Sequence, residues 1–469
     1  MVFSSVVFLS VFLPVVLGLY CLLPGIRIKN GLLIIASLLF YAYGEPVYVL
    51  LMLFSTVMNY LFGRGIDRWG GQKKKVFLVL NVLCNLGMLG LFKYVDMVVQ
   101  TVNTIFHADF PLPGIELPIG ISFFTFQAMS YVIDVYRGQV QAQKNYWNIL
   151  LYISFFPQLI AGPIVKYHDI EKQMEHRKFE IEEVGKGIRR FIVGLSKKVL
   201  ISNVMALAAD AMFGMHVGEM NLLAAWTGAV AYMLQIYYDF SGYSDMAIGL
   251  GHMFGFTFQE NFRYPYSAVT IQDFWRRWHI SLSTWFKEYL YIPLGGNRKG
   301  KVRTCVNKLI VFFATGLWHG ANWTFVVWGL FHGGFLLLEE WLPLKKLPRI
   351  LGHLYALLVV CVGFVLFRAE TLAQGIGVIG RMFTGFRFDA GAMTPVINQM
   401  TPQFLLILAV GILLSFPLTV KLQEKVNGCS VRVKNGVEMA SYAGSILLLL
   451  LCILSLAGGT YNPFIYFRF

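Results

Sequence analysis

The stretch GLWHGANWTF, residues 316–325, places a histidine inside a run of thirty residues, 309–338, that contains no Asp, Glu, Lys or Arg. Because glutamates follow this run directly, we predict that it enters a membrane, breaks, and returns to the side from which it came. Non-helical backbone at membrane depth is tolerated only where it lines a cavity or is packed by protein. We therefore expect His319 to lie near the turn and to face a pore or funnel. Three nearby residues favour the end of a helix: Gly316, Gly320 and Asn322.

The composition of the whole chain agrees with a membrane protein. Its 469 residues are 57% hydrophobic and only 14% charged, and the mean hydropathy is +0.62. A soluble protein of this length would need more charge to cover its surface. We predict an all-α, polytopic membrane fold with about 11 transmembrane helices, plus re-entrant or interfacial helices. The expected apolar runs are residues 2–23, 32–43, 47–62, 76–91, 119–136, 191–213, 222–238, 309–338, 354–367, 404–420 and 441–457.

The net charge of +14 comes from basic residues in short segments between these runs. Lysine and arginine mark the cytoplasmic loops of membrane proteins, so the charge predicts no nucleic-acid partner. If all four basic segments lie in the cytoplasm, the N-terminus and the C-terminus both lie outside. The first run lacks a basic n-region and a cleavage site, so we expect a retained span. The four basic segments are residues 64–75, 298–308, 345–349 and 421–434.

We expect a single membrane domain over residues 1–469. Within it, residues 167–190 have mixed charge and predict a cytoplasmic amphipathic helix or pair. Residues 270–308 predict a buried or re-entrant helix followed by a basic loop, and residues 459–469 an extracytoplasmic tail. The six cysteines show no C-x-x-C spacing and predict neither a disulfide frame nor a metal site.

The sequence TIQDFWRRWHISLSTWFKEYLYIPLGGN, residues 270–297, is predicted to contain one helix of about 22 residues, which Pro293, Gly295 and Gly296 end. Thr270 supplies an N-cap, and Asp273 with Arg277 forms an ion pair at i,i+4 spacing. Its charges exclude a lipid-facing span, so the helix must be buried in protein, re-entrant or interfacial. One face of this helix carries Trp275, His279 and Ser283, with Trp278 beside it.

The residues alone leave the roles of these side chains open. A lone intramembrane histidine such as His319 is about as often a hydrogen-bond partner between helices as a catalyst. The tryptophans could be interfacial anchors, and Arg276 with Arg277 could be a pair that reaches to the headgroups. His332 would point away from His319 on a straight helix, which favours a structural role.

Four blocks of the sequence together resemble the membrane-bound O-acyltransferases. The resemblance covers nearly the whole chain and is greatest to the bacterial branch that contains alginate O-acetylase, peptidoglycan O-acetyltransferase and the teichoic-acid D-alanyl transfer protein. The blocks are SFFPQLIAGPIVKY (154–167), QIYYDFSGYSDMAIGLGHMFGF (235–256), ENFRYPYSAVTIQDFWRRWHISLSTWFKEYLYIPLGGNRKG (260–300) and GLWHGANWTFVVWGLFHG (316–333).

The resemblance implies a ring of tilted helices around a central funnel in a bacterial cytoplasmic membrane. It implies acetyl-CoA, or another acyl thioester, as a donor that enters from the cytoplasm, and an acceptor outside; no metal is expected. His319 matches the family's catalytic histidine and His279 its second characteristic one. A neutral imidazole in a dry tunnel is a good general base for a hydroxyl that attacks a thioester. The residues expected to bind the donor are Arg276, Arg277, Trp275 and Trp278.

The chain ends in NPFIYFRF, and so many apolar residues would be costly to expose. We expect this tail to dock, either at the membrane interface as an anchor or back into the external funnel. Its F-x-Y-x-x-F pattern resembles the C-terminus of the small partner peptide in teichoic-acid D-alanylation, where the tyrosine is the implied acyl carrier. The resemblance implies that Tyr466 takes the acyl group and passes it to an extracytoplasmic partner acyltransferase.

Two other functions remain open. A lipid O-acyltransferase of the same fold would use a phospholipid or sterol acceptor. A proton-coupled transporter or flippase would show repeated halves with broken helices, and the sequence shows no such repeat. For the O-acyltransferase, the acceptor could be alginate, peptidoglycan, teichoic acid or another envelope polysaccharide, with direct transfer or a relay.

Overall fold

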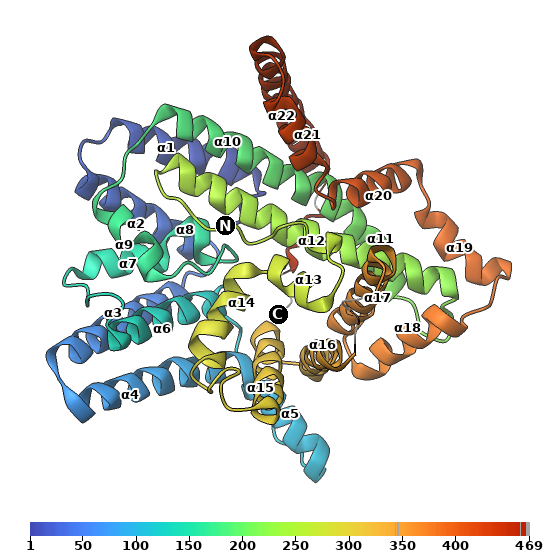
Figure 1. Ribbon diagram of the computed structural model, residues 1–469, viewed down its shortest axis with the longest axis horizontal. Helices are drawn as coiled ribbons and strands as arrows, with labels where there is room; N and C mark the ends of the chain where they lie inside the picture. Colours follow the sequence, from blue (N-terminus) through green and yellow to red (C-terminus); the bar gives the residue numbers. More distant parts are fainter. Residues whose placement is uncertain (343, 345–346, 460, 466–469) are drawn as a thin grey trace. The chain divides into compact units, whose positions relative to one another are not determined.

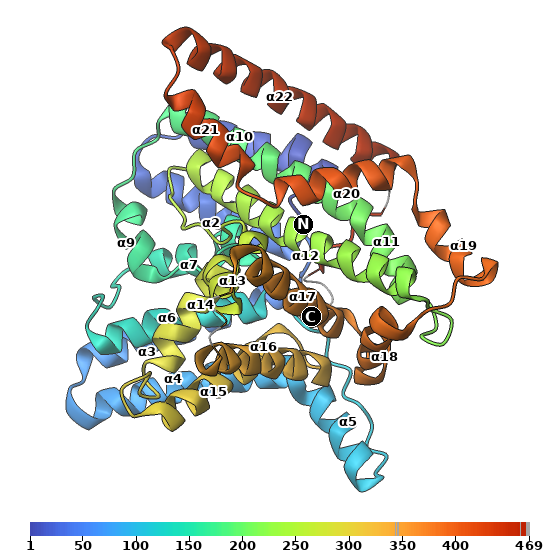
Figure 2. The same ribbon diagram turned by 45° about the vertical axis from the view of Figure 1, so that its right-hand side comes forward.

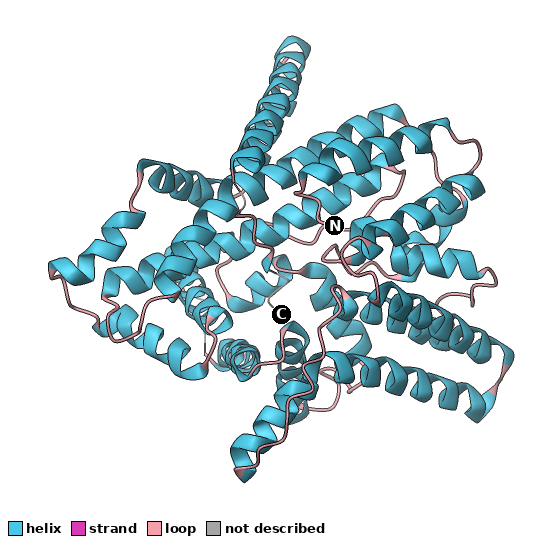
Figure 3. Ribbon diagram, turned by 180° about the vertical axis from the view of Figure 1, so that it is seen from behind, coloured by secondary structure: helices cyan, strands magenta, loops and turns pink. Residues whose placement is uncertain are grey.

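The computed structural model describes residues 1–342, 344, 347–459 and 461–465. Within these ranges the regular secondary structure is entirely helical (Figure 3), which confirms the predicted all-α class. The helices form two compact units. The first comprises residues 1–191 and 246–259, and the second comprises residues 192–245 and 260–469. The prediction of one membrane domain is not tested by this division.

The first unit is built on the N-terminal helices (Figure 1). Its helix α6, teal in Figure 1, is buried along nearly its whole length. Asn81 and Asn85 of α4 both donate hydrogen bonds to Asn59 of α3, at 2.8 and 3.0 Å, which ties two apolar helices together through buried polar groups. The helices are α1 (Leu13–Leu22), α2 (Ile26–Ala42), α3 (Tyr48–Arg68), α4 (Gly71–Leu89), α5 (Val95–Phe106), α6 (Ile121–Arg137), α7 (Tyr146–Ser154), α8 (Phe156–Leu159) and α9 (Tyr167–Glu175).

The second unit contains every candidate site residue that the structure describes. Its core joins aromatic side chains of α12, α13, α16 and α17. A long helix begins with α10 (Ile181–Ser196), which starts in the first unit, and continues through a π-helical turn, η3 (Lys197–Ser202), into α11. The remaining helices are α11 (Asn203–Phe213), α12 (Leu222–Met253), α13 (Ile271–Arg277), α14 (Ile280–Phe286), α15 (Lys301–His319), α16 (Trp323–Trp341), α17 (Arg349–Arg368), α18 (Leu372–Thr384), α19 (Ala390–Gln399), α20 (Pro402–Leu414), α21 (Leu418–Asn427) and α22 (Val431–Gly458).

Several helices are long and apolar enough to cross a bilayer. Among the described residues there are five, and the bent pair α19 and α20, with an angle of 68° at its break, would make a sixth. These helices agree with a multi-pass membrane protein. The larger number of about 11 spans stays a prediction. The five are Tyr48–Arg68, Gly71–Phe106, Ile181–Phe213, Arg349–Arg368 and Val431–Gly458.

The prediction of one continuous helix from Thr270 to the turn at Pro293 is wrong. The chain forms α13, breaks at Trp278 and His279, and starts again as α14. His279 has φ +44°, in the left-handed region that a helix interior excludes. Its side chain therefore does not continue the face that carries Trp275. The break is stabilised by Asn261, whose side-chain oxygen accepts a hydrogen bond from the backbone N–H of Ser281 at 3.1 Å.

Two predicted segments have different boundaries from those expected. The basic loop at 298–308 ends early, because α15 begins at Lys301 and takes up most of its basic residues. The amphipathic segment at 167–190 is predicted to form one helix or a pair of helices, and it forms a pair. The second of the pair is the start of α10, which runs on into a candidate span.

The helical hairpin predicted from the uncharged run is confirmed. Figure 2 shows α15 and α16 side by side, joined by a short break. Two glycines allow the close approach: a Cβ atom on Gly316 would lie 2.4 Å from the carbonyl oxygen of Phe325, and one on Gly329 would lie 2.2 Å from that of Phe312. Such distances are shorter than any van der Waals contact, so the two helices pack with backbone against backbone.

We expect Gly329→Ala to lower the stability of the protein by about 1–3 kcal/mol, the usual cost of overpacking. The matched control is Gly334→Ala on the same helix, where an added Cβ meets no atom within 4 Å. That control should leave the melting temperature unchanged or raise it slightly, because alanine favours helix over glycine. Thermal unfolding in detergent measures both variants, and equal melting temperatures would contradict the close-packing argument.

Candidate functional site

His319 is positioned by the end of α15. Gly320 takes an extended conformation that ends the helix, and a Cβ atom there would lie 2.2 Å from the ring of Phe325. Asn322 then caps α16, since its side-chain oxygen accepts a hydrogen bond from the backbone N–H of Thr324 at 3.0 Å. The predicted break at these residues is confirmed, and it leaves His319 at the helix end with only 5% of its surface exposed.

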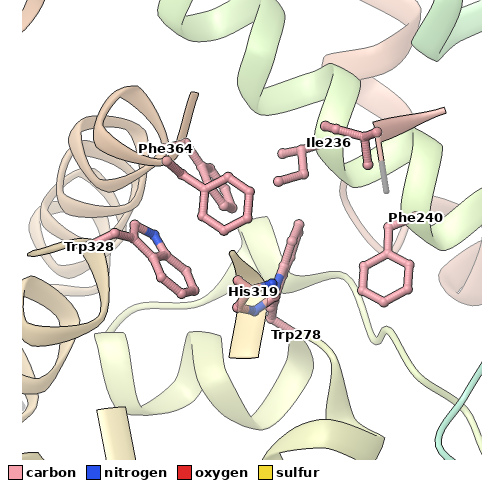
Figure 4. Close-up of a pocket in the computed structure, with 8 residues that line it drawn as sticks. Ile236, Phe240, Trp278, His319, Trp328 and Phe364 are labelled. Carbon is pink, nitrogen blue, oxygen red and sulfur yellow. The ribbon is translucent and has the colours of Figure 1, made fainter. Parts of the chain in front are cut away.

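A small cavity lies against His319 (Figure 4). The volume open to the centre of a water molecule is ≈ 10 Å³, which is room for about one water. Figure 4 shows Trp328 and Phe240 on either side of His319, with Phe364 and Ile236 on the adjoining walls. Besides the imidazole, the described lining side chains carry only the indole N–H groups of Trp278 and Trp328 as polar groups, so a polar group that enters has few partners in the wall. The lining residues are Ile236, Phe240, Trp278, His319, Trp328, Phe364, Phe367 and Ile465.

The imidazole of His319 is enclosed by aromatic rings. Its centroid lies 5.1 Å from the ring of Trp328 and 5.2 Å from that of Phe367, both edge-to-face. The ring of His279 lies 6.3 Å away, so the structure brings the two predicted histidines together. His279 itself is fully buried, packs at 4.5 Å against Phe240, and does not line the cavity.

The four predicted donor-binding residues lie in different surroundings. Trp278 lines the cavity. Trp275 does not, and its ring packs instead at 5.3 Å against His332. Arg277 is held by Asp273, whose carboxylate accepts its Nε–H at 2.9 Å, which confirms the predicted ion pair. Arg276 is exposed, so of the two arginines it is the one available to a ligand in solution.

The C-terminal tail docks back into the protein. Phe464 packs against Tyr243 with ring centroids 5.1 Å apart, and Ile465 is 3% exposed and lines the cavity at His319. Tyr466 and the rest of the F-x-Y-x-x-F pattern lie outside the described residues. The described part of the tail therefore packs into the protein, and its expected place in an external funnel stays a prediction.

Sequence reasoning missed most of the cavity wall. Trp328 falls inside the family-like block at 316–333, nine residues after His319, and that was a usable signal. Ile236 and Phe240 also fall inside a family-like block, at 235–256. Phe364 and Phe367 carry no signal, because they resemble any helix residue that faces lipid or core. Among the described residues, no group of three or more His, Cys, Asp or Glu side chains has the arrangement of a metal site.

Comparison with known proteins assigns this site to a family. A model of the membrane-bound O-acyltransferase family matches residues 137–367, a range that includes His279 and His319. Over its full length the chain is 40% identical to the probable alginate O-acetylase AlgI of Pseudomonas putida, with 100% of each chain covered. The chain belongs to the membrane-bound O-acyltransferase family. The family predicted from the sequence is confirmed.

Other relatives of this membrane-bound O-acyltransferase carry different names. The peptidoglycan O-acetyltransferase of Helicobacter pylori is 36% identical over 81% of this chain and 80% of its own. The teichoic acid D-alanyltransferase of Bacillus subtilis is 28% identical over 54% of this chain and 69% of its own. The protein is therefore an O-acyltransferase, and two relatives that match over the full length of both chains are named probable alginate O-acetylases.

Proposed function

We propose that this membrane-bound O-acyltransferase moves an acetyl group from cytoplasmic acetyl-CoA, through the cavity at His319, to an envelope polysaccharide outside a bacterial cell. One observation carries the proposal: His319 at the end of α15 and Ile465 of the tail line the same buried cavity. The names of the relatives support the acetyl group and the polysaccharide, since two that cover the whole chain are named probable alginate O-acetylases.

In this mechanism His319 is the general base and Tyr466 the first acceptor. The imidazole removes the phenol proton, and the phenolate oxygen attacks the thioester carbonyl. A C–O bond forms, the C–S bond breaks, and the leaving thiolate of coenzyme A takes the proton from the imidazolium. The support for this step is the position of Ile465, because Tyr466 is joined to it by one peptide unit of about 3.8 Å.

The product of that step is a phenyl ester on the tail. A phenyl ester is an activated donor, because phenolate leaves more readily than an alkoxide. An extracytoplasmic partner acyltransferase would transfer the acetyl group to a hydroxyl of the polysaccharide, and the phenol of Tyr466 would be restored. The thioester never has to cross the membrane, which explains how one histidine can serve both sides.

The proposal also includes the arrangement of the membrane and the donor around the site. The ring of about 11 spans encloses the funnel, with membrane lipids around it and both termini outside. The donor approaches from the cytoplasmic side, where Arg276 meets phosphate groups and Trp278 stands at the cavity wall. Arg277 supports the local structure through Asp273 and contributes positive charge near that entrance.

The experiment that tests the function uses the purified full chain with isotope-labelled acetyl-CoA. We expect release of free coenzyme A thiol and a mass increase of one acetyl group on the protein. Label that appears in extracted lipid would favour a lipid O-acyltransferase. No thiol release, with or without a glycan acceptor and partner enzyme, would contradict acyl transfer and favour a transporter.

On the donor side, we expect Arg276→Glu to raise the KM for acetyl-CoA, because a carboxylate would repel the donor's phosphates. An exposed contact of this kind is worth about tenfold or less in KM. Steady-state kinetics at two salt concentrations measure it, and added salt should weaken the effect. An equal change in the dependence on acceptor would mean that Arg276 only shapes α13.

We expect His279→Asn to lower transfer strongly while the protein still folds. Asparagine tolerates the left-handed conformation that position 279 requires, so the substitution removes the imidazole beside His319 without forcing the backbone. We assign His279 as a positioning residue for the His319 ring. The check is kcat as a function of pH: a changed profile supports the assignment, whereas a loss of yield with unchanged kcat and pH profile would contradict it.

A further inference from the structure

A buried ion pair lies next to the cavity, on residues to which the mechanism gives no role. The ammonium of Lys198, in the π-helical turn η3, is 2.8 Å from the carboxylate of Asp239 on α12, and the side chains are 3% and 1% exposed. Removing two charges from water costs several kcal/mol, and their attraction only partly offsets that cost. Buried ion pairs inside membrane proteins therefore mark function more often than stability.

Both members of the pair also bind the tail. The Lys198 ammonium donates a hydrogen bond to the carbonyl of Pro463. The other carboxylate oxygen of Asp239 accepts one from the backbone N–H of Ile465, at 2.8 Å. The cation of the pair thus binds a backbone carbonyl of the tail, and the anion binds a backbone N–H two residues further along the tail. These contacts are to backbone, so they fix where the tail lies and in which direction it runs.

Further contacts hold the residues just before this point. The side chain of Asn203 donates to that of Asn462 at 3.2 Å, and the hydroxyl of Tyr461 donates to Asp210 at 2.5 Å. Three of the partners sit on one continuous stretch, η3 and α11. Residues 461–465 are therefore bound by polar groups that a lipid-facing surface would not contain.

We propose that Lys198 and Asp239 are positioning residues that bind the backbone of residues 463–465 and hold the tail at the His319 cavity for acyl transfer. This rests on the proposed function in one respect, that transfer requires the tail. We call Lys198 and Asp239, with their two contacts to the tail backbone, the clamp. That the clamp binds the tail does not depend on the proposed function. The positions of the two charges match the hydrogen-bonding groups of the tail. If the charges were exchanged, a hydrogen-bond acceptor would face the tail carbonyl and a donor would face the tail N–H.

That matching gives a sharp test, the double variant Lys198→Asp with Asp239→Lys. The ion pair can still form, so a merely structural pair would be restored. The tail contacts cannot, because a carboxylate would face the carbonyl of Pro463 and an ammonium would face the N–H of Ile465. Hydrogen–deuterium exchange of the C-terminal peptide in the full-length protein reads tail binding directly, and transfer from acetyl-CoA is measured on the same sample.

The chain supplies a matched control one residue away. Lys197, also in η3, pairs with Asp245 of α12 at 2.5 Å and makes no hydrogen bond to the described tail residues. We expect Lys197→Met to keep the tail protected and transfer near the wild-type rate. The charge swap should accelerate exchange at the tail about tenfold or more and lower transfer in proportion.

A second pair of variants works from the tail side if the swapped protein does not fold. Ile465→Pro removes the backbone N–H that donates a hydrogen bond to Asp239, and it leaves the ion pair intact. Ile465→Val keeps that N–H. Faster exchange of the peptide before residue 465 in the proline variant alone supports the clamp. Tail protection equal to wild type in the swap or the proline variant would overturn it.

Activity separates the clamp from the proposed function. A released tail with unchanged or increased transfer would overturn the positioning role and indicate that the tail closes the cavity instead. If wild-type protein transfers no acyl group, the proposed function fails, and the exchange data still decide whether Lys198 and Asp239 bind the tail.

Discussion

Replacing His319 by alanine is expected to abolish acyl transfer while the protein still inserts and folds. General-base catalysis contributes about 10²–10⁴ in rate, and His319 is the one ionisable side chain among the described residues that line the cavity. The rate of thiol release from acetyl-CoA, measured on purified protein with a known melting temperature, tests this. Mass spectrometry of the tail should show no acetyl ester in the variant.

The control for this prediction is His332→Gln. His332 is equally buried and aromatic-lined, with Trp328 shared between the two histidines, at 5.1 Å from His319 and 5.3 Å from His332. It does not line the cavity. We expect the control to retain transfer, even if its yield falls. Full activity in His319→Ala, or equal loss in both variants at equal folding, would contradict the assignment of His319 as the base.

The position of His319 could be predicted because its signals are local. An uncharged run of membrane length, with glycine and asparagine near its middle, has to turn where the helix breaks. Gly320 and Asn322 end α15 and begin α16, as expected. The docking of the tail followed from a similar argument, since the apolar residues at 464 and 465 would otherwise be exposed to water.

The break at His279 could not be predicted from its own neighbourhood. No glycine or proline stands at 278 or 279, and local propensity favours a continuous helix there. The left-handed residue is stabilised by a distant segment: Asn261 caps α14 through its side chain, and its carbonyl accepts the N–H of Ile280 at 3.0 Å. Tertiary contacts therefore overrode propensity.

Lys198 and Asp239 had a signal that went unused. Asp239 directly follows the predicted apolar run 222–238, and the structure carries the helix through it to Met253. An acid in the middle of a buried apolar helix requires a partner. Which lysine supplies that partner depends on the π-helical turn at 197–202, and sequence periodicity does not predict such a turn.

The second large effect is expected from Tyr466→Phe, which should reduce O-acylation of the polysaccharide to background. The variant keeps the aromatic ring, so it preserves packing and removes only the hydroxyl that would carry the acetyl group. Tail binding through the backbone of Pro463 and Ile465 does not involve that hydroxyl. Cells or membranes with the partner enzyme and labelled acetyl-CoA give the rate, and tail exchange should match wild type.

A tail tyrosine five residues earlier provides the matched control. Tyr461→Phe also removes one hydroxyl, and that hydroxyl bonds to Asp210, so the variant loses one hydrogen bond and no carrier. A net loss of about 1 kcal/mol in tail binding predicts at most about a fivefold decrease in transfer. If Tyr466→Phe acylates the polymer as fast as Tyr461→Phe, the ester relay is wrong and acetyl must pass directly from the thioester to the acceptor. If only Tyr466→Phe loses O-acylation of the polysaccharide, and the acetylated tail peptide is also lost, the phenol of Tyr466 carries the acyl group. Because the two variants each remove a single hydroxyl oxygen and keep the ring, loss of packing cannot explain a defect that occurs in only one of them.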